Sequence, residues 1–254
     1  KFDTDGTRYI WNNRYCADNF VKGALDYLSD PNGDGDESDS LINQADVITY
    51  HPYSYFVNPE VINERDLTGV TDIAETYNLN TANAWHTEFG WSTATFPINS
   101  ACIGDDYAQA KNIIRQYASM YARNNADKLF IYDFMDDDIV TNAQESNYGL
   151  IHSELYNTPY AAKFSYLAVS NINKMTEGLP NAELVYNTVD DLYTGDYGTE
   201  TNGYGTKGEM VVKFGGESGR EVYMLWGIED NKEISYKIPE NVVAYYDWLG
   251  NRID

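Results

Sequence analysis

The sequence predicts an α/β fold in which a parallel sheet is followed by a small antiparallel β domain. Up to about residue 176, short apolar segments alternate with amphipathic helical patterns, which is typical of βα units on a parallel sheet. From about residue 180, short segments of alternating hydrophobicity are separated by turn residues, which indicates antiparallel strands. We therefore expect one domain over residues 1–178 and a second over residues 179–254.

The elements of the first domain follow from the spacing of its apolar residues. Compact apolar runs predict strands over residues 47–50, 82–90 and 128–135. Apolar side chains recur on one helical face over residues 17–28, 64–79, 105–125 and 158–176, and the last of these segments has a proline in its first turn. Helices between consecutive parallel strands place functional loops at the carboxyl ends of the strands.

The second domain is expected to contain four short strands, over residues 209–215, 220–228, 234–238 and 242–250. Turn residues separate each segment from the next. The segment 194–209 is rich in glycine and polar residues, so we expect a surface loop or hairpin there.

Polar and aromatic side chains gather where each expected strand of the first domain ends. His51 and Tyr53 follow the first strand, Glu88 and Trp91 lie at the end of the second, and an acidic group follows the third. Because alternate residues of a strand share a face, His86 and Glu88 are expected on the same, inward-facing side. The carboxyl ends of neighbouring parallel strands lie at one edge of a sheet, so these side chains predict a site around Glu88.

Four segments of the chain resemble one enzyme family. They are DVITYHPYSY, AWHTEFGWST, LFIYDFMDD and NYGLIHSELYNTPYAAKFSYLAV, and they resemble strands six, seven and eight and the final helix of the clan A glycoside hydrolases. The resemblance covers roughly residues 17–176, and the segment from Arg220 to Asp254 is similar to the small β-sandwich that often follows such barrels. The implied fold is the C-terminal portion of a (β/α)8 TIM barrel, with strands six to eight and their helices, followed by an antiparallel β-sandwich.

The resemblance also implies catalytic roles. The carboxylate that ends strand seven is the nucleophile of these retaining enzymes, and Glu88 stands at this position. An aromatic residue or a histidine at the end of strand six contacts the nucleophile or the substrate, which matches His51 and Tyr53. Hydroxyl or imidazole donors would hold the carboxylate ionised and oriented.

A sugar-binding subsite is expected beside this carboxylate. In the family that the sequence resembles, an aromatic ring from strand eight stacks on the sugar, and here Tyr132 or Phe134 would take that role. His86 and Trp91 complete the expected lining. The expected partner is therefore a carbohydrate, and the resemblance implies no cofactor for catalysis.

A retaining mechanism requires two carboxyl groups, about 5 Å apart, of which one attacks the anomeric carbon and the other protonates the leaving oxygen. The family's acid/base glutamate follows an asparagine at the end of strand four, and no segment matches that pattern. The pair Asn63-Glu64 lies instead at an expected helix start, where the helix dipole favours an acidic residue. We expect the acid/base residue and the N-terminal half of the barrel on another chain, or on a segment that this sequence does not include.

A second class of function stays open because the acid/base residue is missing from the pattern. In that class the chain is a non-catalytic carbohydrate-binding protein, or an extracellular structural protein of a filament or surface, built on a degenerate barrel. The tyrosine and acid content favours the structural form. A second carboxylate near 5 Å from Glu88 in the assembled protein would favour the enzyme.

The segment DPNGDGDESDS resembles the first half of an EF-hand loop. Alternate oxygen ligands, Asp30, Asn32, Asp34 and Asp36, occupy positions 1, 3, 5 and 7 around a glycine turn. Position 12, which should supply a bidentate carboxylate, is Leu41. A structural calcium ion and a solvated acidic loop are both consistent with this pattern.

Composition excludes some classes of partner. The formal net charge of -23 would repel nucleic acid and anionic membranes, and no apolar run approaches the roughly 18 residues that span a bilayer. The polar start KFDTDGTRYIW has no apolar signal-peptide core, so we interpret Lys1 as a processing or fragment boundary. The resemblance to the glycoside hydrolases implies a secreted or extracellular protein. Cys16 and Cys102 are consistent with either a disulfide or two free thiols.

Overall fold

The computed structural model describes residues 23–42, 47–53, 58–60, 76–77, 84–95, 103–123, 126–139, 142–189, 207–229 and 233–253. Both cysteines lie outside these ranges, as do almost all of the helix expected over 64–79 and most of the loop expected over 194–209. Of the helix expected over 17–28, the described part is helical over residues 23–29.

The parallel sheet predicted from the sequence is present. Its strands are β1 (Ile48–Tyr50), β2 (Ala84–Phe89) and β3 (Lys128–Ile131), in the order β1-β2-β3, and both pairings are parallel. The register between β2 and β3 shifts between His86 and Phe89, which marks a β-bulge or irregularity in the ladder. This shift lies directly before the end of β2 and affects which side chains share a face.

Helix α3 (Asp106–Ala122) follows β2 and agrees with the expected helix over 105–125. Asp105 caps it, because its side chain accepts a hydrogen bond from the backbone N–H of Tyr107 at 2.9 Å. The side chains of Ala110, Ile113 and Ala118 are fully buried, so one face of the helix contributes to the core.

Helix α4 (Phe164–Thr176) begins at residue 164 and not at residue 158 as the pattern predicted. The preceding residues belong to the loop that follows β3, which also contains the 3₁₀ helix η4 (Glu145–Asn147). Tyr160 has a φ of 60°, which an α-helix excludes, and Ala162 forms an antiparallel bridge with Ile151. Lys163 is buried against the same loop, so tertiary contacts shift the start of the helix toward the C-terminus.

The chain then forms a three-stranded antiparallel sheet of β4 (Asn181–Asn187), β5 (Glu209–Gly215) and β6 (Glu221–Gly227), in that order. Strands β5 and β6 were predicted, whereas β4 was not. A short hairpin of β7 (Tyr245–Tyr246) and β8 (Arg252–Ile253) lies within the described C-terminal residues. A further 3₁₀ helix, η1 (Glu37–Asp39), lies in the acidic loop.

Two expected strands of the second domain differ from the structure. Residues 234–238 do not form a strand, although their side chains alternate between exposed and half-buried, and the expected strand over 242–250 is reduced to β7. The alternation reflects an extended segment with one side against the protein, as the ring of Tyr236 lies 5.8 Å from that of Tyr186. Alternating burial therefore does not require a hydrogen-bonded ladder here.

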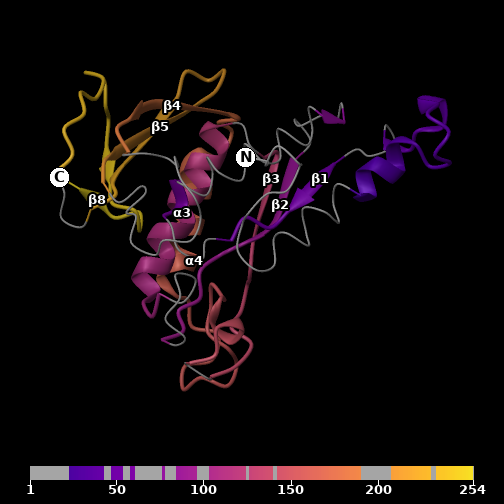
Figure 1. The fold of residues 1–254 in the computed structure, drawn as a ribbon. Coiled ribbons are helices and arrows are strands. Elements are labelled where there is room, and N and C mark those ends of the chain that lie inside the picture. The colour runs from indigo at the N-terminus through magenta and orange to yellow at the C-terminus, as the bar shows by residue number, and fades with distance from the viewer. Residues whose placement is uncertain are drawn as a thin grey trace.

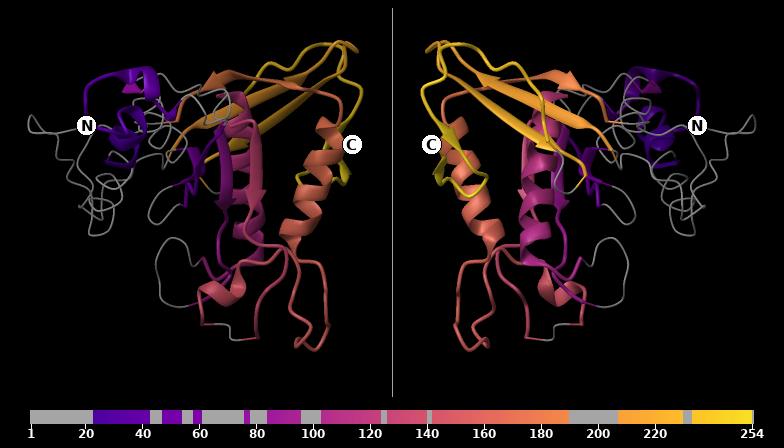
Figure 2. Two further views of the ribbon diagram at one scale, coloured as in Figure 1. Left: turned by 90° about the vertical axis from the view of Figure 1, so that its right-hand side faces the viewer. Right: turned by 90° about the vertical axis from the view of Figure 1, so that its left-hand side faces the viewer.

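Helix α3 stands between the two sheets, with α4 beside it (Figures 1 and 2). On one side, Ile113 packs with Phe89 and Trp91 from the end of β2. On another, Ala118 packs with Met210 and other side chains of the antiparallel sheet. The parallel and antiparallel parts of the chain thus share one helix as a common core element.

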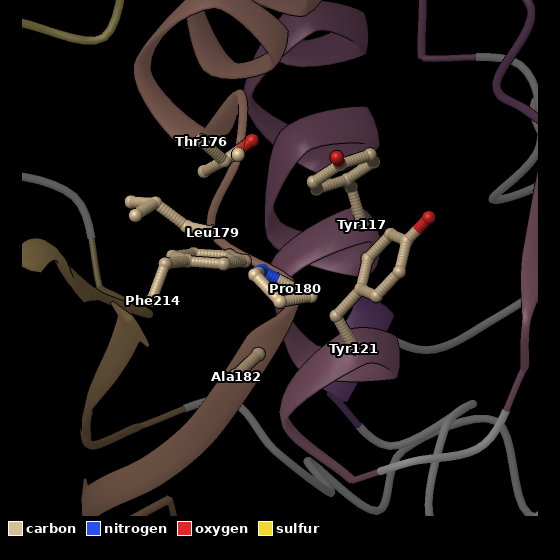
Figure 3. Close-up of a pocket in the computed structure, with 8 residues that line it drawn as sticks. Tyr117, Tyr121, Thr176, Leu179, Pro180, Ala182 and Phe214 are labelled. Carbon is tan, nitrogen blue, oxygen red and sulfur yellow. The ribbon is translucent and has the colours of Figure 1, made fainter. Parts of the chain in front are cut away.

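A cavity of about 500 Å³ lies where α3, the turn after α4 and the antiparallel sheet meet (Figure 3). Its lining includes the rings of Tyr117 and Tyr121, whose centroids are 4.8 Å apart, and the side chains of Pro180 and Phe214. Burial, and next the neighbouring Tyr117, raise the pKa of the Tyr121 hydroxyl.

None of the helices in the described ranges has the length and apolar character needed to cross a membrane.

Candidate active site

Glu88 lies at the carboxyl end of β2 and is approached by two side chains that follow β1. The Tyr53 hydroxyl donates a hydrogen bond of 3.0 Å to Oε2 of Glu88, and Nδ1 of His51 lies 3.3 Å from the same oxygen. Adjacent parallel strands run in one direction, so their ends bring residues 35 positions apart in the chain into contact. The structure therefore groups three of the predicted site residues around one carboxylate oxygen.

The carboxylate is accessible from solvent. Side-chain exposure is 37% for Glu88 and 49% for His51. Burial, and then the hydrogen bond to Glu88, raise the pKa of the Tyr53 hydroxyl far above its usual range. Tyr53 consequently remains a neutral hydrogen-bond donor whenever Glu88 is ionised, which orients one carboxylate oxygen and leaves the other available for chemistry.

Three tyrosine rings form a wall beside this carboxylate. Tyr132, directly after β3, has its ring centroid 6.4 Å from that of Tyr53, and Tyr148 has its centroid 5.8 Å from Tyr53 and 5.4 Å from Tyr132. All three contacts are edge-to-face, a favourable arrangement for aromatic rings. We call Tyr53, Tyr132 and Tyr148 the tyrosine wall.

Close contact between the ends of β2 and β3 positions Tyr132. Its backbone N–H donates a 2.9 Å hydrogen bond to the carbonyl of Phe89, and the Tyr132–Asp133 peptide bond is cis. A Cβ atom on Gly90 would overlap the carbonyl oxygen of Tyr132. Only glycine therefore permits this approach without a backbone shift.

His86 does not lie with Glu88 on the inward-facing side as expected. Its Nδ1 is 2.8 Å from the sulfur of Met120 on α3, its Nε2 contacts the Tyr50 hydroxyl, and the residue is 1% exposed. The register shift between His86 and Phe89 breaks the alternation, so that both of these side chains are buried while Glu88 faces His51 and Tyr53. His86 is a core residue in this structure.

Trp91 and Phe134 also lie apart from the carboxylate contacts. Trp91 is 1% exposed and packs with Phe89, Ile113 and Leu150. Phe134 is 63% exposed in the loop after β3. Of the two aromatic residues expected to stack on a sugar, Tyr132 rather than Phe134 belongs to the tyrosine wall, where its ring contacts those of Tyr53 and Tyr148.

The loop after β3 is fixed by a buried ion pair that the sequence did not reveal. Asp136 accepts a 2.6 Å hydrogen bond from Nζ of Lys163 and lies 3.2 Å from Nδ1 of His152, and the side chains of Asp136 and Lys163 are fully buried. Lys163 also donates to the Thr93 hydroxyl at 3.2 Å, which joins the loop to the segment after β2. Lys163 was expected inside a helix, where no such role is visible.

The acidic loop closes on itself. The Asp30 carboxylate accepts hydrogen bonds from the backbone N–H groups of Gly33, Asp34 and Gly35, and Asp34 and Asp36 accept from the N–H groups of Asp36 and Ser38. Asn32 accepts from Asp34 in the same way. Within the described ranges, no three His, Cys, Asp or Glu side chains are grouped as metal ligands. A structural calcium ion in this loop stays a prediction.

Comparisons with known proteins indicate a glycoside hydrolase-like fold. No protein-family model and no curated protein matches the sequence. The structure is similar to that of a family 39 glycoside hydrolase from the gut symbiont Bacteroides cellulosilyticus WH2, with a TM-score of 0.62 and 20% sequence identity. The alignment covers 92% of this chain and 43% of that one, so this chain spans less than half of the length of its structural neighbour. At this identity the likeness is one of fold.

Two further glycoside hydrolase structures overlap with smaller parts of the chain. A family 17 β-1,3-glucanosyltransferase from Rhizomucor miehei aligns with a TM-score of 0.36 and 14% identity over 48% of this chain and 45% of that one. A GH2 β-galacturonidase from Eisenbergiella tayi aligns with a TM-score of 0.38 and 15% identity over 51% of this chain and 24% of that one. These partial overlaps do not define the fold.

Proposed function

We propose that this chain carries the nucleophile of a retaining glycoside hydrolase, and that Glu88 is that nucleophile. The contact between Tyr53, His51 and Oε2 of Glu88 carries the proposal, because it holds an accessible carboxylate in one orientation at the end of a parallel strand. The glycoside hydrolase-like fold supports the reaction class. The resemblance to clan A in particular, stated from the sequence, belongs to the same proposal.

In the proposed mechanism, the free oxygen of Glu88 attacks the anomeric carbon of a sugar and forms a covalent glycosyl-enzyme ester. Tyr53 stays neutral and keeps its hydrogen bond to the other oxygen, so the attacking oxygen remains aligned. Water then hydrolyses the ester after activation by the acid/base residue, and the anomeric configuration is retained. The substrate is a carbohydrate, and Tyr132 offers an aromatic ring beside the reacting centre.

The acid/base residue is proposed to come from barrel strands that this chain does not supply. Within the described residues, β1 and β3 each have a neighbouring strand on one side only. On one face of the sheet, the ring of Trp85 packs against that of Phe130, which is 45% exposed. Exposed aromatic rings on a sheet face favour burial by further protein elements. A second half of the barrel would complete both edges of the sheet and bring a carboxyl group to about 5 Å from Glu88. An extracellular location is part of the proposal.

Replacement of the nucleophile tests the proposed function. In the protein with its barrel complete, we expect Glu88→Gln to lower kcat/KM on a panel of 4-nitrophenyl glycosides by at least about 10⁴-fold, because an amide cannot form the glycosyl ester. The exposed Glu217→Gln serves as a matched control and should leave activity unchanged. Both variants are compared by thermal unfolding, so that loss of fold is distinguished from loss of chemistry.

The same assay tests where the acid/base residue lies. Here glycosides with poor leaving groups replace the 4-nitrophenyl glycosides. The chain alone should not hydrolyse them, and hydrolysis should appear when the remaining barrel strands, from another chain or from a segment outside this sequence, are added. Full hydrolysis by Glu88→Gln would refute the nucleophile assignment. Full hydrolysis by the isolated chain would refute the proposal that the acid/base residue lies elsewhere. No hydrolysis by the complete barrel would favour the non-catalytic carbohydrate-binding or structural alternative.

A further inference from the structure

Tyr148 was not singled out by any sequence pattern, yet it lies at the back of the tyrosine wall. It directly follows η4 and is 2% exposed. Its ring meets the rings of Tyr53 and Tyr132 at interplanar angles of 68° and 65°. A buried ring in this position covers Tyr53 on the side away from solvent, without presenting its own surface to a substrate.

The hydroxyl and the backbone of Tyr148 are both held by side chains. Nε2 of Gln144 donates a 2.8 Å hydrogen bond to the Tyr148 hydroxyl. Gln109, which is fully buried on α3, donates from Nε2 to the carbonyl of Tyr148 at 3.1 Å and to that of Trp91 at 2.8 Å. The Ser165 hydroxyl on α4 donates to Oε1 of Gln109 at 2.8 Å, which fixes the amide. The loops after β2 and β3 are therefore joined behind the site by one amide.

The position of Tyr148 affects the bond between Tyr53 and Glu88 through water exclusion. Burial is the largest cause of the raised pKa of Tyr53, and the ring of Tyr148 contributes to that burial. In a drier environment the hydrogen bond from Tyr53 to the Glu88 carboxylate is stronger, because water competes less for both groups. Removal of the Tyr148 ring would admit water and allow Tyr53 to rotate.

We propose that Tyr148, held by Gln144 and Gln109, is a positioning residue that keeps Tyr53 against Glu88. The proposal rests on the proposed role of Glu88 as the nucleophile. Tyr148 acts through Tyr53 and does not touch the reacting atoms. The consequence is that loss of its ring should slow the chemical step while substrate binding is retained.

Two variants, each made in the protein with its barrel complete, test the proposal by kinetics. Tyr148→Phe keeps the ring, and Tyr148→Leu removes it. We expect Tyr148→Leu to lower kcat by about ten- to a hundredfold with KM within about twofold of the parent, since small misalignments of reacting groups have effects of this size. Tyr148→Phe, which loses the hydrogen bond from Gln144, should lower kcat by no more than about two- to fivefold. A Tyr148→Leu enzyme with parental kcat, or with a raised KM alone, overturns the proposal.

A second measurement does not depend on hydrolysis. The Cζ carbon of Tyr53, assigned by comparison with Tyr53→Phe, is followed by NMR in protein labelled at tyrosine. In the parent protein Tyr53 should remain un-ionised well above pH 10, whereas in Tyr148→Leu it should ionise nearer to about 10, the value of a solvated tyrosine. An unchanged titration in the folded variant overturns the proposal. If the parent lacks glycosidase activity, the proposed function fails, and this titration still decides whether Tyr148 positions Tyr53.

A third variant covers the case in which Tyr148→Leu does not fold. Gln144→Leu removes the hydrogen bond to the Tyr148 hydroxyl and leaves the ring in the protein. It should lower kcat in the same direction, by about two- to fivefold, as expected for the loss of one neutral hydrogen bond of about 0.5–1 kcal/mol. Parental kcat together with a parental Tyr53 titration in Gln144→Leu overturns the proposal.

Discussion

At the scale of single residues, Asp133 shows how burial controls a carboxyl group near the site. It directly follows Tyr132, and its Oδ1 atom is buried with no hydrogen-bond partner in the described part of the chain. Burial, and then the nearby Asp137 and Asp136, raise the pKa of Asp133 to about 6. The folded protein therefore binds a proton at Asp133 over a pH range in which the unfolded chain releases it.

This shift gives a pH dependence of known sign. The folded-state pKa of about 6 exceeds the ordinary aspartate pKa of 3.8, so the stability associated with the proton is fully present below about pH 4 and is lost as the pH rises through about 6. We expect Asp133→Asn, which is neutral at every pH, to be more stable than the parent at about pH 7 and similar to it at about pH 4. Urea unfolding at a series of pH values measures this difference, and Glu217→Gln is the control. Parallel stability curves for parent and Asp133→Asn would contradict the account.

Some residues of the site could be predicted from local sequence patterns, and others could not. His51, Tyr53 and Glu88 could be predicted because each lies at or directly after the end of an apolar strand, and parallel strands bring such ends together. The direction of the His86 side chain could not be predicted, because the register shift in β2 interrupts the regular alternation of faces that the sequence pattern implies. Tyr148 lies in an irregular loop, where no periodicity indicates which way a ring points.

At the scale of secondary-structure elements, a buried ion pair joins the parallel and antiparallel parts of the chain. Glu60, which follows β1, receives two 2.7 Å hydrogen bonds from the Arg115 guanidinium on α3 and a third 2.7 Å bond from the indole N–H of Trp226 on β6. Glu60 is fully buried, and among the residues that the structure describes, these donors compensate its charge. The three elements are consequently held in one relative position.

Removal of one charge from this ion pair should be strongly destabilising. We expect Glu60→Gln to lower the free energy of unfolding by about 3–5 kcal/mol, since it leaves Arg115 buried without a counter-charge. Glu183→Gln is the matched control, because its pair with Lys213 is exposed to solvent and should contribute little to stability. Chemical denaturation measures both variants. A loss for Glu60→Gln that is no larger than the loss for Glu183→Gln would show that the buried pair does not stabilise the fold.

The elements themselves were predictable to different degrees. Strands β1, β2 and β3 and helix α3 have the apolar patterns of their type within the segment itself. The start of α4 was not predictable, because the buried ion pair between Lys163 and Asp136 holds the preceding residues in the loop. Strand β4 escaped prediction because no residue in it is fully buried, so its apolar pattern is weak.

At the scale of the whole molecule, the fold is shared with a much longer glycoside hydrolase. The chain corresponds to 43% of that structure, and its described parallel sheet has three strands. Both facts agree with the proposal that this chain contributes the nucleophile and that other barrel strands contribute the acid/base residue. From the sequence, this expectation rested on the missing acid/base motif of the family that the sequence resembles. The position of a second carboxylate relative to Glu88 depends on tertiary structure, which no local pattern contains.

Covalent trapping tests the central claim most directly. The protein, with its barrel complete, is incubated with a panel of 2-deoxy-2-fluoroglycosyl fluorides, which form the glycosyl-enzyme ester and hydrolyse it slowly. Peptide mass spectrometry then locates the added sugar. We predict that one labelled peptide contains Glu88, that the sugar is attached to this residue, and that Glu88→Gln is not labelled. Hydrolysis with the sugar attached to another carboxylate, or with inversion and no covalent adduct, would contradict the account.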